Sequence, residues 1–215
     1  MSTLTKVALS WIGHLKPDRV KERAAEVLEL PPPQKTGGLP LMDALVGRHS
    51  GREFAATPLP LPVLSNLLWA AFGINRPNSG GRTAPSAINA QEIDVYAALS
   101  GGLYIYDVKA HALRSVAAVD ARAVTGYQDF VDEAPLDLIY VADNAHMKAV
   151  TPSLRSVYSA ASAGAIAQNV YLFCASAGLA TVLRGWFDRD AVARALGLTS
   201  DEHVVLTQTV GYPQH

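Results

Sequence analysis

The segment from Arg82 to Gln91 concentrates groups that could bind a ligand. Arg82 offers a guanidinium, and Asn89 and Gln91 can each donate and accept hydrogen bonds. Between them lies a run of small or turn-forming residues, Pro85, Ser86 and Ala87. Such residues allow the backbone to approach a flat molecule closely, but they also form ordinary polar surface turns. Taken alone, this segment is compatible with either interpretation.

A second polar cluster comprises Arg48, His49, Ser50 and Arg52. Guanidinium forks and a serine hydroxyl are groups that hold a phosphate. The cluster therefore suggests an anion site, with a solvated helix end as the alternative.

A third candidate is the turn at Arg184 and Gly185. A glycine between a strand and a helix can present backbone amides to an acceptor. The alternative is an ordinary connection, in which Trp186 and Phe187 pack in the core and Asp188 caps the next helix.

Other chemistries find little support. Cys174 is the only cysteine, which excludes an intrachain disulfide and indicates inert packing. The six histidines show no metal-ligand spacing, so we predict no metal site. The sequence contains no GxGxxG, GxxxxGK[ST] or GxSxG motif.

The composition indicates one globular domain. The chain has 215 residues, 49% of them apolar and 17% charged, which suffices for a full core. A net charge of −1 gives no electrostatic case for binding nucleic acid or an anionic membrane. The uncharged run 156–183 is rich in alanine and interrupted by Ser, Gln and Asn, so it predicts a buried helix rather than a membrane span. With no secretory signal evident, we expect a cytoplasmic protein.

Hydrophobic periodicity predicts alternating helices and strands. The predicted helices cover residues 18–30, 41–46, 62–72, 121–131, 156–177 and 188–196. The predicted strands cover residues 93–99, 103–106, 112–117, 136–142, 181–183 and 203–210. Residues 75–88 are predicted to form a long, Gly-rich loop. This alternation around one long helix indicates an α/β or α+β domain.

The order of the polar clusters resembles that of a known family. An Arg-His-Ser-x-Arg segment, a Pro-Ser-x-x-Asn-x-Gln loop, an Ala-rich helix ending in Ala-x-Gly-Leu, a Gly-Trp-Phe-Asp turn and a final Val-Gly-Tyr are similar to the FMN-dependent nitroreductases. The similarity runs from about Leu41 to Pro213. We therefore expect a helical extension and linker over residues 1–40 and an FMN-binding domain over residues 41–215. The resemblance implies an α+β fold with a mixed central sheet flanked by helices and a long buried central helix. It also implies a homodimer with the flavin at the interface.

The resemblance further implies roles for individual residues. Arg48, His49 and Ser50 match the phosphate segment, and Arg52 matches the basic residue near flavin N1/O2. The residues that would contact the flavin from the partner subunit are Pro85, Ser86, Ala87 and Asn89. Arg184 and Gly185 match the turn whose amides lie near flavin N5, although many relatives carry Glu where Arg184 stands. Gln128 would meet the pyrimidine edge of the ring.

The implied activity is hydride transfer from NAD(P)H through flavin N5 to a small acceptor such as a nitroaromatic or a quinone. It needs no catalytic side chain, because solvent can protonate the product. Many relatives carry basic residues after the Gly-Tyr segment that this chain lacks, and Arg82, then Arg76, are the expected substitutes. Gly-Gly-Arg-Thr-Ala-Pro-Ser-Ala is also similar to the branch that includes azoline-peptide oxidases. An azoline oxidase, a flavin-binding protein with little turnover and a flavin-free interaction protein are the alternatives.

Overall fold

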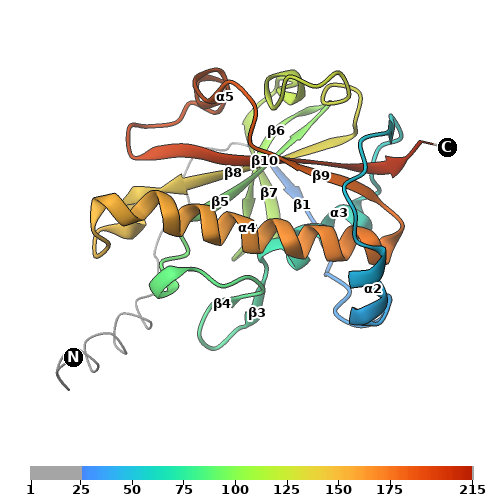
Figure 1. Cartoon of the computed structure of the whole chain (residues 1–215), viewed down its shortest axis with the longest axis horizontal. Coiled ribbons are helices and arrows are strands. Elements are labelled where there is room, and N and C mark those ends of the chain that lie inside the picture. The colour runs from blue at the N-terminus through green and yellow to red at the C-terminus, as the bar shows by residue number, and fades with distance from the viewer. Residues whose placement is uncertain (1–25, 215) are drawn as a thin grey trace.

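A central antiparallel sheet organises the protein (Figure 1). The computed structural model describes residues 26–214. Among these residues the sheet has eight strands in the order β1-β7-β6-β5-β8-β10-β2, with β9 paired to β10. Their bounds are β1 Val27–Glu29, β2 Phe54–Ala55, β5 Ile93–Leu99, β6 Gly102–Asp107, β7 Ala112–Ala117, β8 Leu136–Asp143, β9 Ala180–Arg184 and β10 Glu202–Pro213. Each pairing between these described strands is antiparallel.

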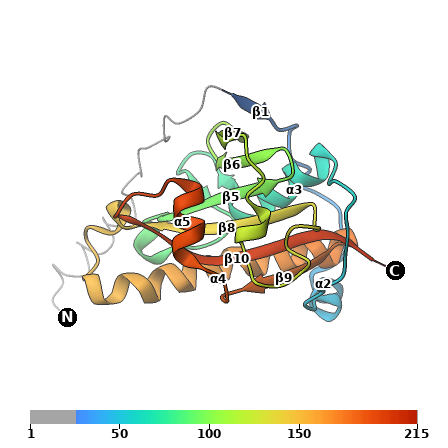
Figure 2. The same cartoon turned by 90° about the horizontal axis from the view of Figure 1, so that it is seen from above.

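The two faces of the sheet carry different helices because successive strand residues point to opposite sides. On one face, Leu138 and Tyr140 of β8 pack with α3 (Leu61–Phe72) and α4 (Pro152–Ala177). On the other, Ile139 and Val141 pack with α5 (Arg189–Leu196). Figure 2 accordingly shows α4 and α5 on either side of β10. The structure confirms the predicted α+β class, with a central sheet, flanking helices and a long central helix. The sheet was predicted to be mixed, but among the described strands it is antiparallel throughout.

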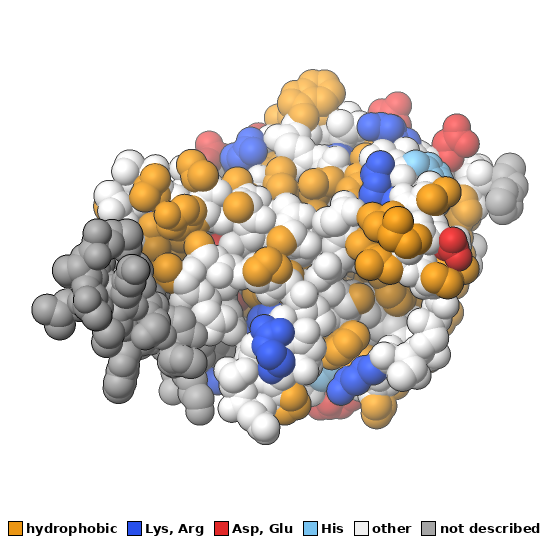
Figure 3. All heavy atoms as spheres, turned by 60° about the horizontal axis from the view of Figure 1, so that its bottom comes forward, with side chains coloured by type: hydrophobic (Ala, Val, Ile, Leu, Met, Phe, Trp, Pro, Cys, Tyr) orange, Lys and Arg blue, Asp and Glu red, His pale blue; other side chains and the backbone are white. Residues whose placement is uncertain are grey.

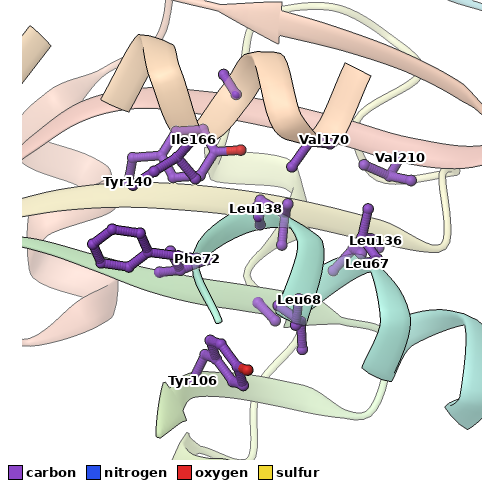
Figure 4. Close-up of a cluster of buried hydrophobic side chains, with 14 of the residues drawn as sticks. Leu67, Leu68, Phe72, Tyr106, Leu136, Leu138, Tyr140, Ile166, Val170 and Val210 are labelled. Carbon is purple, nitrogen blue, oxygen red and sulfur yellow. The ribbon is translucent and has the colours of Figure 1, made fainter. Parts of the chain in front are cut away.

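The larger core lies between α3, α4 and the sheet (Figure 4). Leu67 and Leu68 of α3 are fully buried, as are Ile166 and Val170 of α4. Each such side chain contributes roughly 1.5–3 kcal/mol through removal from water. This packing fixes α4 against the sheet, so the groups at its two ends are held in a defined relationship.

Helix α2 (Leu41–Gly47) lies against the C-terminal end of α4. The amide of Leu39, just before α2, donates to Ser176 Oγ at 2.7 Å. α4 ends at Gly178, whose φ of 69° is the left-handed conformation that favours glycine. No helix among residues 26–214 combines the length and apolarity needed to cross a bilayer.

Most predicted elements are confirmed. Strands 93–99 and 112–117 have the predicted bounds, and the predicted helices 41–46, 62–72, 156–177 and 188–196 correspond to α2, α3, α4 and α5. The remaining predicted strands correspond to β6, β8, β9 and β10, with ends that differ by one to three residues.

Two predicted helices are wrong where the structure describes them. Residues 27–29 of the predicted helix 18–30 form β1, which pairs with β7 at the sheet edge; residues 18–25 lie outside the described part. Over 121–131 the only helical segment is the 3-10 turn Arg122–Val124. Both segments have apolar residues at helical spacing, but pairing with β7 overrides the first and the buried anchoring of Thr125 interrupts the second.

The predicted loop 75–88 contains more regular structure than expected. β3 (Ile74–Arg76) and β4 (Gly81–Arg82) form a two-stranded hairpin. Gly80, with φ of 68°, lies in its turn. A 3-10 turn, Ala87–Asn89, follows.

Candidate functional site

The segment after α2 lies against Tyr171, near the C-terminal end of α4. The guanidinium carbon of Arg48 is 5.3 Å from the centre of the Tyr171 ring, within cation–π range. Ser50 Oγ is 2.8 Å from the Tyr171 hydroxyl oxygen, which also accepts a hydrogen bond from the Leu183 amide at 2.9 Å. The Tyr171 hydroxyl therefore joins the Arg48 segment to β9. Sequence reasoning missed this residue; its only signal is an aromatic hydroxyl in an Ala-rich helix.

Backbone contacts hold the same segment beside β9. The Gly51 amide donates to Thr181 O at 3.0 Å, and a Cβ on Gly51 would lie only 3.0 Å from Ala180 Cβ. His49 Nδ1 lies 2.9 Å from Gly47 O, so Nδ1 carries the hydrogen that it donates. The Arg52 side chain is exposed just before β2. Arg48, Ser50 and Arg52 thus belong to a segment that runs along the first residues of β9.

The turn at the end of β9 presents its backbone rather than its arginine. Gly185 is exposed, whereas Arg184 is buried. Arg184 Nη2 donates to Asp137 Oδ1 at 2.5 Å and to Thr125 Oγ1 at 3.1 Å. Burial raises the pKa of Asp137 to about 6, and the charge of Arg184 opposes that rise. The Arg184 side chain is therefore directed into the core, so at this position only the backbone can meet a ligand.

Gln128 lies beside the same turn. Its Oε1 is buried with no hydrogen-bond partner within the described part of the chain. A Cβ on Gly126 would lie 1.9 Å from Arg184 Nη1 and 2.8 Å from Gln128 Oε1, so only glycine permits this approach. The structure thus brings Gln128 close to Arg184 at the end of β9.

The Pro85–Gln91 loop is tightly structured. Ile88, Asn89 and Gln91 have φ values of 51°, 56° and 50°, in the left-handed region. The Gln91 amide donates to Ser86 Oγ, and Gln91 Nε2 donates to Asn89 Oδ1 at 3.2 Å. Much of the polar capacity of this loop is therefore used within it, which fixes its shape.

The two groups lie at opposite ends of α4. Ile88 and Ala90 of the loop pack with Tyr158 near the start of the helix, whereas Arg48 lies on Tyr171 near its end. Thirteen residues separate the two tyrosines, about 20 Å at the rise of an α-helix. A single chain therefore does not bring the predicted halves of the site together.

Arg82 contacts the Pro85–Gln91 loop rather than the Arg48 segment. Its guanidinium carbon lies 5.0 Å from the centre of the Phe72 ring, and Nε donates to Gln91 Oε1 at 2.9 Å. Burial lowers the pKa of Arg82. Arg76 Nη2 donates to the carbonyl of Arg82 at 3.2 Å, so both arginines that were predicted to help hold the phosphate lie at the hairpin.

The alternative reading of the 183–188 turn is partly right. Phe187 is buried, and Asp188 caps α5 by accepting from the Ala191 amide at 3.0 Å. Trp186, however, is 69% exposed rather than packed in the core.

Comparison with known proteins identifies the family of this chain. The model of the nitroreductase family matches residues 45–212. The chain belongs to the nitroreductase family. Family membership makes the protein an oxidoreductase of the nitroreductase type.

Individual relatives agree with this nitroreductase assignment. A protein of Methanocaldococcus jannaschii named "Putative nitroreductase" is 30% identical over 181 residues, covering 80% of this chain and 90% of the relative. A crystal structure titled as a putative nitroreductase from Ralstonia eutropha is 50% identical, with a TM-score of 0.85, covering 92% of this chain and 97% of that one.

More distant structures share the nitroreductase fold alone. The NADPH:FMN oxidoreductase of Vibrio harveyi, complexed with NAD+, has a TM-score of 0.61 at 19% identity, covering 81% of this chain and 69% of that one. A chain of the microcin synthetase complex of E. coli has a TM-score of 0.70 at 20% identity, covering 78% of this chain and 69% of that one.

Proposed function

We propose that this nitroreductase binds FMN and passes electrons from NAD(P)H to a small planar acceptor, a nitroaromatic or a quinone. The observation that carries the proposal is the link from Ser50 through Tyr171 to Leu183, which ties the Arg48 segment to β9 two residues before the exposed Gly185. A surface guanidinium, a hydroxyl and a turn of backbone amides suit a phosphate joined to a hydrogen-bonding ring. The name of the Vibrio harveyi enzyme, an NADPH:FMN oxidoreductase, supports the same cofactor.

The candidate residues attached to β9 fit FMN chemically. Bound FMN would supply two-electron redox chemistry between a reduced nicotinamide and the acceptor. Arg48 and Ser50 would hold the phosphate, and the Arg52 cation would stabilise negative charge near N1/O2. The amide of Gly185 would donate to the ring, while the buried Oε1 of Gln128 still lacks a donor within residues 26–214.

We further propose that the site is completed by a second copy of the chain. Exposed apolar side chains cover α2: Leu41, Met42, Leu45 and Val46, with Val46 87% exposed. Others, Leu154 and Val157, are exposed near the start of α4. Figure 3 shows apolar side chains gathered at the end of the face where α2 lies, with basic side chains beside them. Apolar surface of this kind indicates a protein interface.

A twofold axis across α4 would reconcile the two separated groups. It would place the end of one α4 beside the start of the partner's α4. The exposed apolar side chains of α2 would then lie over the partner's Leu154 and the partner's Val157. The same operation would carry the partner's Pro85–Asn89 loop toward Arg48. An isologous contact of this kind closes into a dimer.

The overall reaction balances without a catalytic side chain. A quinone takes the equivalent of a hydride, two electrons and one proton, from NAD(P)H. It takes a second proton from solvent, giving a hydroquinone and NAD(P)+. The protein contributes binding, orientation and charge stabilisation.

Purified protein tests this proposal directly. We expect a yellow protein whose flavin absorbance bleaches when NADPH or NADH is added without oxygen. Arg48→Ala should weaken FMN binding roughly 10- to 100-fold, through loss of a charge-assisted hydrogen bond. Arg194→Ala, an exposed residue of α5 on the other face of the sheet, is the matched control and should bind FMN normally. Protein that neither carries nor takes up FMN would refute the proposal.

A further inference from the structure

Two exposed aromatic residues stand beside the Gly185 turn. Trp186 is 69% exposed and Tyr127 is 55% exposed. Their ring centroids are 5.1 Å apart, with an interplanar angle of 57°. Although 59 positions separate them in the sequence, they form one aromatic corner at the surface.

The backbone that carries each ring is held in place by buried neighbouring residues. Trp186 lies between β9 and the buried Phe187, and Arg189 lies 4.7 Å from the Phe187 ring centre. Tyr127 follows Thr125, whose carbonyl accepts from Thr207 Oγ1 at 2.9 Å and whose hydroxyl accepts from Arg184. The exposure of the two rings is therefore not the consequence of a loose loop.

Exposed indole and phenol rings in a fixed arrangement are unusual on a surface that serves no binding role. Such large side chains provide apolar contact area at a low cost in conformational entropy. Their electron-rich faces attract electron-poor partners, and offset or edge contacts between rings stabilise aromatic pairs. Arg189 Nη2 lies 3.4 Å from Gly185 O, so a cation also borders the corner.

We propose that Tyr127 and Trp186 bind the aromatic ring of the electron acceptor, an electron-poor nitroarene or quinone. This inference rests on the proposed flavin site, because the corner is adjacent to the Gly185 turn assigned to the reacting edge of the cofactor. Trp186 forms the wall nearest that turn, and Tyr127 sets its orientation. The pair determines which acceptor binds and leaves flavin binding unchanged.

The test compares wild-type protein with Trp186→Ala, Tyr127→Ala and the conservative Trp186→Phe. Flavin content and the rate of NAD(P)H oxidation by ferricyanide, which has no ring to stack, should be the same in all four. The KM for menadione and for nitrobenzene should rise roughly five- to tenfold in both alanine variants, and Trp186→Phe should recover most of the loss.

A binding measurement provides an independent readout. Nitrobenzene quenches tryptophan fluorescence on contact, so titration of the oxidised holoprotein should show a saturable component that Trp186→Phe removes. The remaining tryptophans, Trp11 and Trp69, supply the background.

Three results would overturn the inference in distinguishable ways. Wild-type protein without flavin would refute the proposed function itself. Loss of flavin or of the dimer in the alanine variants would mean that the pair serves the cofactor or the interface. Unchanged KM values for both acceptors, with flavin retained, would show that the acceptor does not contact the pair.

Discussion

The guanidinium of Arg184 donates to the carboxylate of Asp137 beneath the loop that carries Tyr127 and Gln128. Both side chains are almost completely buried, with 3% and 0% of their surfaces exposed. Thr209 Oγ1 also donates to the same carboxylate oxygen. The arginine at this position is thus accounted for by an acid inside the sheet rather than by a ligand.

Replacing this arginine should destabilise the fold. Arg184→Ala leaves Asp137 buried without its cation, and we expect a loss of about 3–5 kcal/mol in the free energy of unfolding, measured by urea denaturation at pH 8. Because burial holds the pKa of Asp137 above its ordinary value, the folded state gains stability as the pH falls through about 6. The deficit of the variant should therefore shrink at pH 5. Arg194→Ala should change stability by less than about 0.5 kcal/mol.

The tyrosine that joins the phosphate segment to β9 gives a second prediction. Tyr171→Phe removes the hydroxyl that contacts Ser50 and the Leu183 amide, at a cost of roughly 1–2 kcal/mol. FMN affinity, measured by quenching of flavin fluorescence, should fall several-fold because Ser50 loses its support. Tyr104→Phe on β6 is the control. Equal FMN affinity in the two variants would contradict the role assigned to Tyr171.

Much of the fold could be predicted from local sequence. The strand 93–99 and the helix capped by Asp188 follow from period and capping residues, which act within a few positions. The strand at residues 27–29 could not be predicted, because its pairing with residues 112–114 depends on a sheet edge built by distant sequence. The helix predicted over residues 121–131 is absent for a similar reason, because Thr125 is held by the distant residues Arg184 and Thr207.

The individual polar clusters of the site could be predicted from the sequence, but their positions relative to one another could not. The Arg48 cluster and the Gly185 turn are both attached to β9, the first through the hydrogen bond from the Gly51 amide to Thr181 O and the second at the end of the strand. No local pattern indicates that the Pro85 loop packs at the far end of α4 or that Trp186 remains exposed. Both follow from where β9 and α4 lie against the sheet.

The dimer proposal predicts the effect of a charge on α2. Val46→Asp places a carboxylate in the proposed contact with the partner's α4, so the variant should sediment as a monomer and lose FMN together with the dimer. The matched control is Val119→Asp, because Val119 is 50% exposed in the loop after β7. A dimeric Val46→Asp protein with full flavin content would place the interface elsewhere.

A buried acid next to the Pro85 loop gives a prediction about pH. Glu92 is completely buried. Burial raises its pKa above the ordinary value, although hydrogen bonds from its own backbone and from Ser162, and the charge of His146, oppose this rise. Between the ordinary and the raised pKa the folded chain binds more protons than the unfolded chain, so the free energy of unfolding falls as the pH rises through that window.

Glu92→Gln keeps the shape of the side chain without its charge. The free energy of unfolding of this variant should exceed that of wild type by on the order of 1 kcal/mol at pH 8, with little difference at pH 4.5. Urea denaturation at both pH values measures the difference, with the exposed Glu133→Gln as control. A Glu92→Gln protein that is less stable than wild type at pH 8 would show that the ionised carboxylate is favourably bound in the folded state.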